Sequence, residues 1–366
     1  MEKFIFAIMF VLSAALSLHA FDARPGQASS GYGSTQYYLS ANYGWDWSTL
    51  SNRVKYSETG QGSMEYGTYV WAFVPNQLKN GSSAPVYIYL HGFFCMVPDI
   101  YMAHIEHLLR QGYIVLFPVF QPSRFGLLNS MGMFDAADQQ EWLDNAVVES
   151  ENMLARIGSR ADRSQVYLFG HSLGGALTTR FTRSQRELGK MNFTVRGIVM
   201  ANPQINPDAG LPAFVSSMIE IVPIDYADGA KGIDVPTIIM SGDQDEIALM
   251  PQVSQIYNNI PSTTRKAGWK IISDKISYFN WGVFYSGDLT ADHGSPMCDA
   301  GSWLINAALS LMGIGWVELD TQDYRIYWAA TDAIRDGVVN VPWNMGTWKK
   351  RSDGPKAPVR CDGGCQ

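Results

Sequence analysis

The stretch VYLFGHSLGGALTTRFTRSQREL, residues 166–188, carries the most structural information in this chain of 366 residues. It opens with a short apolar run, passes through GHSLG, and continues into a helix-forming segment. Glycines two residues before and two after a serine remove side chains that would collide in a tight turn, and they lift the hydroxyl above a sheet. Ser172 is therefore the candidate nucleophile, and the alternative is an ordinary glycine-rich turn.

The rest of the chain alternates predicted strands with predicted helices. Short runs rich in apolar, β-branched and aromatic residues predict strands at 67–74, 86–90, 113–117, 166–169, 195–200 and 237–240. Helical spacing of apolar residues predicts helices at 101–110 and 141–157. This order predicts an α/β fold with a doubly wound, mostly parallel sheet and helices on both faces.

A serine hydroxyl is a weak nucleophile until a neighbouring base takes its proton. His293, in the polar segment TADHGSPM, is the one histidine that follows Ser172 in the sequence, so it is the candidate base. His171 lies beside the nucleophile in the tight turn and is assigned a structural role. His104 and His107 fall on a predicted helix, where we expect them to be packed or solvated.

A carboxylate is expected after a later strand, where it would orient the imidazole and stabilise its positive charge. The segment SGDQDEIA follows the run TIIM and offers Asp243, Asp245 and Glu246. Asp243 comes directly after Gly242 and could instead cap a turn.

A tetrahedral intermediate also needs backbone donors for its oxyanion. Leu173, the residue after the nucleophile, is one candidate. The other lies in YLHGFFC, where Gly92 allows the backbone to turn back toward the serine, so Phe93 is preferred over Phe94. The alternative is a simple strand-to-helix turn at His91 and Gly92.

These motifs together resemble the α/β-hydrolase family, in its secreted esterase and lipase branch. The resemblance covers roughly residues 65–312 and rests on HGFF at 91–94, GHSLGG at 170–175, GDQDEI at 242–247 and DHG at 292–294. It implies an eight-stranded sheet and ester hydrolysis through an acyl-enzyme without a cofactor. In many such enzymes the acid is the second Asp of a GxxD pattern, which maps to Asp245.

The residue patterns and the resemblance together divide the chain. We expect a signal peptide at 1–20, an irregular leader at 21–64, a catalytic domain at 65–312, and an extension at 313–366 packed on the core. The extension departs from the family pattern, and its aromatic residues could also help bind substrate. A non-catalytic binding module and a peptidase or acyltransferase with the same triad are the alternatives to an esterase.

Residues 1–20 predict the cellular location. One Lys precedes an apolar run that is too short to span a bilayer, and Ala20 is followed by a polar segment. This pattern is typical of a cleaved secretory signal, so we expect an extracellular or periplasmic protein; an uncleaved anchor is the alternative. No other stretch is long and apolar enough for a membrane span.

Four cysteines in an exported chain favour disulfides over a metal site, since no CxxC or HxxxH spacing accompanies them. Cys361 and Cys365 are close enough to close a small loop, which would leave Cys95 to pair with Cys298. Free thiols are the alternative.

Composition limits the partners. The chain has 27 Lys and Arg against 34 Asp and Glu, a net charge of −7, with no basic cluster for nucleic acid. We expect a monomer acting on a small-molecule or lipid-like ester. The segment 121–137 holds apolar residues such as Phe125 and Met131, and with Phe94 these could line an acyl pocket or form a lid. A buried crossing segment would explain the loop equally well.

Overall fold

A computed structural model describes most of the chain after residue 62. The described residues are 18–19, 54–55, 63–75, 78, 82–93, 95–122, 137–206, 221–280, 283–298, 306, 309, 314, 317, 319–348 and 353–366. The predicted signal peptide, the leader and the loop 121–137 therefore lie almost entirely outside the described residues.

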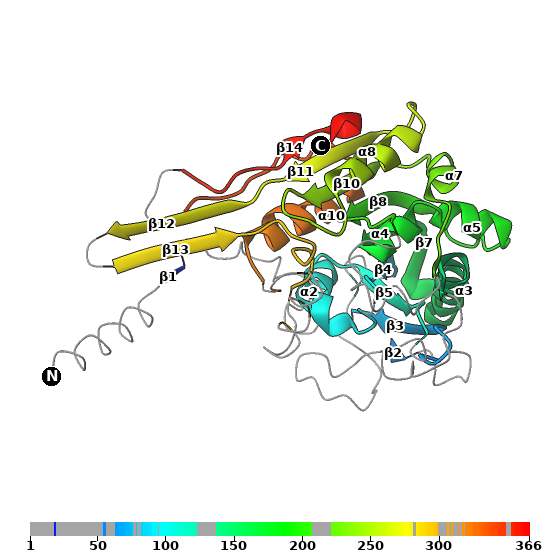
Figure 1. Cartoon of the computed structure of the whole chain (residues 1–366). Helices are drawn as coiled ribbons and strands as arrows, with labels where there is room; N and C mark the ends of the chain where they lie inside the picture. The colour runs from blue at the N-terminus through cyan, green and yellow to red at the C-terminus, as the bar shows by residue number, and fades with distance from the viewer. Residues whose placement is uncertain are drawn as a thin grey trace, which may run out of the picture.

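Among the described residues, a nine-stranded sheet forms the centre of the structure (Figure 1). In sheet order its strands are β14 (Val359–Arg360), β11 (Lys266–Ile271), β10 (Thr237–Gly242), β8 (Val195–Ala201), β7 (Ala161–His171), β4 (Ala84–Leu90), β5 (Ile114–Val119), β3 (Tyr69–Phe73) and β2 (Val54–Lys55). The six strands from β11 to β5 are mutually parallel, and β3 and β14 pair antiparallel with their neighbours. The predicted mostly parallel sheet is confirmed, and β14 adds a ninth strand beyond the eight that we expected.

The central strands are apolar on both faces because both faces are covered. Along β4, Tyr87 and Tyr89 contribute to one core while Val86, Ile88 and Leu90 contribute to the other. All five side chains are fully buried. Such continuous apolar runs are typical of parallel strands between two helical layers.

Helices cover each face of the sheet. The first core includes buried residues of η2 (Pro98–Tyr101), α2 (Met102–Arg110), η5 (Asp323–Tyr327) and α10 (Trp328–Arg335). The second includes residues of α3 (Gln139–Ile157), α4 (Leu173–Thr178), α5 (Phe181–Glu187), α7 (Tyr226–Ala230) and α8 (Met250–Asn259). The structure also contains the short elements β6 (Ala137–Asp138), β9 (Ile221–Val222), η4 (Gly158–Arg160) and η6 (Asp362–Gly364).

Helix α3 begins two residues earlier than predicted, at Gln139. Asp138 is the reason, because its carboxylate accepts hydrogen bonds from the backbone N–H groups of Gln140 (2.9 Å) and Glu141 (3.3 Å). An aspartate at this position satisfies amides that have no partner within the helix.

A long hairpin precedes the His293 segment and was not predicted. Strands β12 (Asp274–Asn280) and β13 (Val283–Leu289) pair antiparallel and extend away from the central sheet, and β1 (Leu18–His19) pairs with β13 (Figure 1). The Tyr278 and Tyr285 rings stack across the hairpin with centroids 4.9 Å apart. Tyr285 also packs with Trp348, which ties the hairpin to the C-terminal segment.

The C-terminal segment contributes to the core of the sheet domain. Tyr327 and Trp328 are fully buried within the first core. Near the end of the chain, β14 pairs with β11, and a disulfide joins Cys361 to Cys365.

The second expected disulfide, between Cys95 and Cys298, is not formed in the structure. Both thiols are buried and have other partners. Cys95 Sγ lies 3.9 Å from Met297 Sδ, and Cys298 Sγ lies 3.4 Å from Asp323 Oδ1. The prediction paired these cysteines by elimination, and their local packing accommodates them as thiols.

Candidate active site

The serine of GHSLG occupies a strained turn between β7 and α4. Ser172 has φ 55° and ψ −121°, a left-handed conformation that non-glycine residues rarely adopt. Its flanking glycines are required by space: a Cβ on Gly170 would lie 2.4 Å from the Gly174 carbonyl oxygen, and one on Gly174 would lie 2.2 Å from the Leu90 oxygen. The turn holds Ser172 at the carboxyl end of β7, as the motif predicts.

Three predicted residues meet in a line of hydrogen bonds. His293 Nε2 lies 2.7 Å from Ser172 Oγ, and His293 Nδ1 lies 3.1 and 3.0 Å from the two oxygens of Asp245. All three residues are buried. Since an ionised carboxylate only accepts, Nδ1 carries the proton and Nε2 presents its lone pair to the serine hydroxyl.

The backbone after β10 holds the Asp245 carboxylate in place. Asp245 Oδ1 accepts hydrogen bonds from the N–H groups of Ile247 (2.9 Å) and Ala248 (2.7 Å). These bonds leave the carboxylate directed at His293 and supply donors within a buried environment, where an unpaired charge would be costly.

Asp243, the competing candidate, faces a different partner. Its Oδ1 accepts from the Ser273 backbone N–H at 3.0 Å and from the Ser273 hydroxyl at 2.5 Å. Ser273 Oγ in turn accepts from the Ala291 N–H at 2.9 Å. Asp243 thus supports the segment that leads to His293, a role that the turn-cap interpretation did not anticipate.

The end of β4 lies directly against the serine turn. The Gly174 N–H donates to the His91 carbonyl at 3.1 Å, and a Cβ on Gly92 would lie 3.3 Å from the Ser172 Cβ. Phe93 follows Gly92 and is partly buried, while Leu173 follows Ser172 at the first position of α4. The structure therefore brings both segments that carry the oxyanion candidates to the serine. Phe94, Phe125 and Met131 lie outside the described residues.

His91 is a neutral ring in the wall of this region. Burial lowers its pKa to about 4, and its ring stacks on Phe120 with centroids 4.1 Å apart. Its Nδ1 lies 2.7 Å from the Gly92 carbonyl, which can only accept, so Nδ1 carries the proton.

Asn202 was missed at the sequence level, although it supports the His293 segment. It follows β8 with φ 49°, and its Nδ2 donates to the Asp292 carbonyl at 2.8 Å and the His293 carbonyl at 3.3 Å. A polar residue after a parallel strand was the available signal, because the carboxyl ends of such strands meet at one edge.

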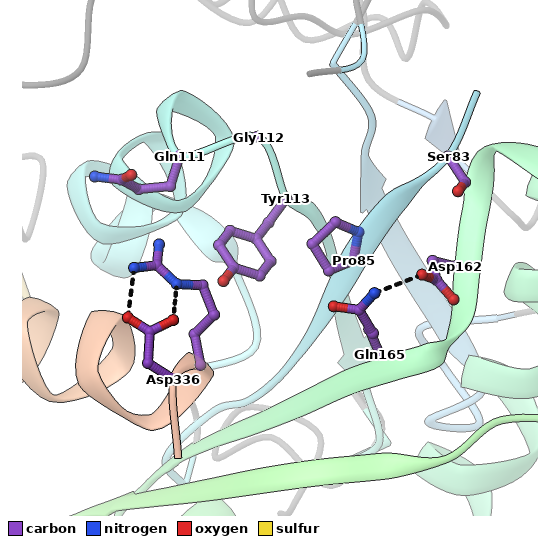
Figure 2. Close-up of a pocket in the computed structure, with 9 residues that line it drawn as sticks. Ser83, Pro85, Gln111, Gly112, Tyr113, Asp162, Gln165 and Asp336 are labelled. Carbon is purple, nitrogen blue, oxygen red and sulfur yellow. Dashed lines mark hydrogen bonds and ion pairs between the residues drawn. The ribbon is translucent and has the colours of Figure 1, made fainter. Parts of the chain in front are cut away.

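A pocket of about 430 Å³ lies at the opposite edge of the sheet (Figure 2). Its lining residues are Ser83, Pro85, Gln111, Gly112, Tyr113, Asp162, Gln165, Arg335 and Asp336. Most of these residues flank the starts of β4, β5 and β7, and Arg335 and Asp336 lie at the end of α10, whereas Ser172 follows the end of β7. Arg335 pairs with the Asp336 carboxylate, and the Asp162 carboxylate accepts a hydrogen bond from the Gln165 amide. The pocket is thus separate from the serine site.

Metal ligands are not clustered in the part of the chain that the structure describes. No group of three or more His, Cys, Asp or Glu side chains there could hold a metal ion. Among the same residues, no helix has the length and apolar character needed to cross a bilayer.

Comparison with known proteins identifies the family. The sequence model of the alpha/beta hydrolase family matches residues 87–318. This range is more than half of the chain and includes Ser172, Asp245 and His293. The chain belongs to the alpha/beta hydrolase family. A comparison with curated proteins gives no match.

Solved structures similar to this hydrolase include proteins named as esterases and one named as an aminopeptidase. Esterase B from Lactobacillus rhamnosis has 17% identity and a TM-score of 0.45, over 60% of this chain and 74% of that one. Est1E from Butyrivibrio proteoclasticus has 16% identity and a TM-score of 0.40, over 57% and 86%. A putative dipeptidyl aminopeptidase IV from Bacteroides ovatus has 13% identity and a TM-score of 0.46, over 60% and 32%. Similarity this distant does not distinguish an ester from a peptide substrate.

Proposed function

We propose that this hydrolase cleaves carboxylic esters through an acyl-enzyme, with Ser172, His293 and Asp245 as its catalytic triad. The observation that carries the proposal is the 2.7 Å contact between Ser172 Oγ and His293 Nε2, with Asp245 on the far side of the imidazole. The direction of the hydrogen bonds supports the required proton transfer, because Nε2 is the unprotonated nitrogen.

In the proposed acylation step, Ser172 Oγ attacks the ester carbonyl while its proton passes to His293 Nε2. The imidazolium is stabilised by Asp245, which keeps its negative charge. Collapse of the tetrahedral intermediate breaks the bond to the alcohol, which leaves with the proton from His293. A water molecule then attacks the acyl group, again with His293 as base, and releases the acid and the free serine.

The backbone N–H groups of Leu173 and Phe93 are the proposed donors to the oxyanion. Their positions support this role, since Leu173 begins the helix after the serine and Phe93 follows the Gly92 contact with Ser172. Preorganised amides of this kind act where the negative charge develops.

We also propose that the protein is exported and acts on a small or lipid-like ester. The N-terminal sequence supports export, and the Cys361–Cys365 disulfide is consistent with an oxidising compartment. Expression with the natural N-terminus, followed by N-terminal sequencing of exported protein, should find Phe21 as the first residue. Retention of Met1 on a membrane-bound product would contradict cleavage.

The decisive experiment is a panel of p-nitrophenyl esters of increasing acyl length, tested with wild type and Ser172→Ala. We expect the variant to lose about 10³-fold or more of kcat/KM on every ester that the wild type cleaves. Ser150→Ala is a matched control, because Ser150 is a buried serine on α3. Equal turnover in the Ser172 variant and wild type would overturn the proposal, and faster cleavage of peptide p-nitroanilides would favour a peptidase.

A further inference from the structure

Two buried side chains, Tyr101 and His171, connect three segments that surround the serine. The Gly92 N–H donates to Tyr101 Oη at 3.1 Å, and Tyr101 Oη lies 2.8 Å from His171 Nδ1. On the other side of the ring, His171 Nε2 lies 2.9 Å from the His293 carbonyl oxygen. The chain of contacts runs from the end of β4, through the nucleophile turn, to the segment that carries His293.

The hydrogen-bond acceptors determine which atom carries the proton at each of these contacts. The His293 carbonyl can only accept, so His171 Nε2 carries the proton and Nδ1 has the lone pair. Tyr101 must then donate its hydroxyl proton to Nδ1, and its oxygen is left to accept from the Gly92 N–H. Burial holds the pKa of His171 well below its usual value, so the ring is neutral and this assignment persists at neutral pH.

The surrounding packing restricts the movement of these hydrogen-bonded side chains. Tyr101 and His171 are almost completely buried, and the ring centroids of His171 and His293 lie 5.2 Å apart. A Cβ on Gly92 would lie 3.2 Å from His171 Nδ1 and 3.4 Å from Tyr101 Oη. Side chains in such close contact transmit a displacement of one segment to the next.

We propose that Tyr101 and His171 are positioning residues, which fix the oxyanion segment and the His293 segment relative to each other across the serine turn. The inference rests on the proposed function of that site. Reaction rates depend steeply on such placement, because donors and base must be in position before charge develops. Asn202 also holds the His293 carbonyl, so the segment keeps one anchor when His171 is replaced.

A double-mutant cycle tests the connection. Tyr101→Phe removes the hydroxyl that joins Gly92 to His171. His171→Gln can keep a donor near the position of Nε2 but has no atom at the position of Nδ1 to accept from Tyr101. If the two residues act through one hydrogen-bonded connection, the first substitution already breaks it. The second substitution should then have little further effect.

We expect each single variant to lower kcat on a p-nitrophenyl ester about tenfold, with KM within about twofold, which is the effect of one buried hydrogen bond on the barrier. The double variant should lose about as much as either single one, rather than the ~100-fold that independent effects would give. Tyr113→Phe is the matched control, because Tyr113 is equally buried at the opposite edge of the sheet and should leave kcat unchanged.

The outcomes separate this proposal from the proposed function. Wild-type kcat in Tyr101→Phe, a change in KM alone, or fully additive losses would overturn the positioning role while Ser172→Ala remained inactive. Activity in Ser172→Ala would instead overturn the triad. If His171→Gln does not fold, a comparison of Tyr101→Phe with Tyr113→Phe still tests the proposal. A hydroxyl with only a structural role would lower the thermal midpoint of unfolding without changing kcat.

Discussion

Asp243 and Asp245 are separated by one residue, yet their carboxylates bind different partners. Asp245 faces the His293 imidazole, whereas Asp243 holds Ser273. The turn after β10 therefore places Asp245 in the candidate active site. It places Asp243 against Ser273, where it supports the segment that leads to His293.

This difference predicts unequal effects of the two amide substitutions. Asp245→Asn should lower kcat/KM by about 10³- to 10⁴-fold, because the amide cannot keep the imidazole in its reactive tautomer as a negatively charged acceptor does. Asp243→Asn should cost no more than about tenfold, since it weakens a support to the His293 segment. Steady-state kinetics on one ester compare the two, and equal losses would show that the acid was assigned incorrectly.

The crowding around the serine turn predicts a cost for adding a single methyl group. Gly174→Ala would place its Cβ against the Leu90 carbonyl, so we expect about 2–3 kcal/mol loss in the free energy of unfolding. Gly364→Ala is the control, because nothing lies within 4 Å of its Cβ position, and its effect should stay within about 0.5 kcal/mol. Guanidinium unfolding measures both, and equal stabilities would contradict the close approach of α4 to β4.

Asp292 predicts a stability that depends on pH. Burial raises its pKa to about 6 from an ordinary value of 3.8. The folded protein therefore keeps a proton that the unfolded chain has already released, and the carboxyl costs stability as pH rises from about 4 to about 6. Asp292→Asn can still accept from the Gly294 N–H and should stabilise the fold by on the order of 1–2 kcal/mol at pH 8, and by less at pH 4.5.

Unfolding experiments at the two pH values give this comparison. Asp288→Asn serves as the control, because Asp288 is exposed on the hairpin. A gain for Asp292→Asn that is equal at both pH values, or larger at pH 4.5, would argue against a raised pKa.

The cysteines predict a thiol count that distinguishes the possible pairings. In guanidinium without reductant, Ellman's reagent should find two thiols, from Cys95 and Cys298, and four after reduction. In the native state both should react slowly, because they are buried and burial raises the pKa of Cys95 to about 11. Finding no thiols without reductant would mean that the second disulfide forms after all.

Much of the sheet was predictable because parallel strands buried on both faces leave continuous apolar runs. The strands β4, β8 and β10 follow such runs closely, whereas β7 begins five residues before its predicted run. Strand β11 was missed because its sequence KAGWKI mixes lysine and glycine with apolar residues. The hairpin strands β12 and β13 were missed too, since much of their surface faces solvent and the apolar signal is weak.

The candidate site was likewise predictable only in part. Ser172, Asp245 and His293 follow local motifs, so their segments could be chosen without coordinates. The bond between Tyr101 and His171 joins residues 70 positions apart, and no local pattern marks it. Cysteine pairing likewise depends on neighbours such as Met297 and Asp323, which become adjacent only in the folded chain.

Strand β14 has a consequence for how this molecule reaches its final form. Its two residues cover the outer border of β11, so a nascent chain that ends before residue 359 leaves that border's amide and carbonyl groups open to other polypeptides. Because β14 follows the other strands of this sheet in the sequence, synthesis passes through a stage in which β11 is complete but its border is uncovered, with a risk of self-association. Pairing of β14 with β11, together with the hydrogen bond from the Cys361 N–H to the Gly268 carbonyl (3.0 Å), would then cover that border and end the vulnerable period.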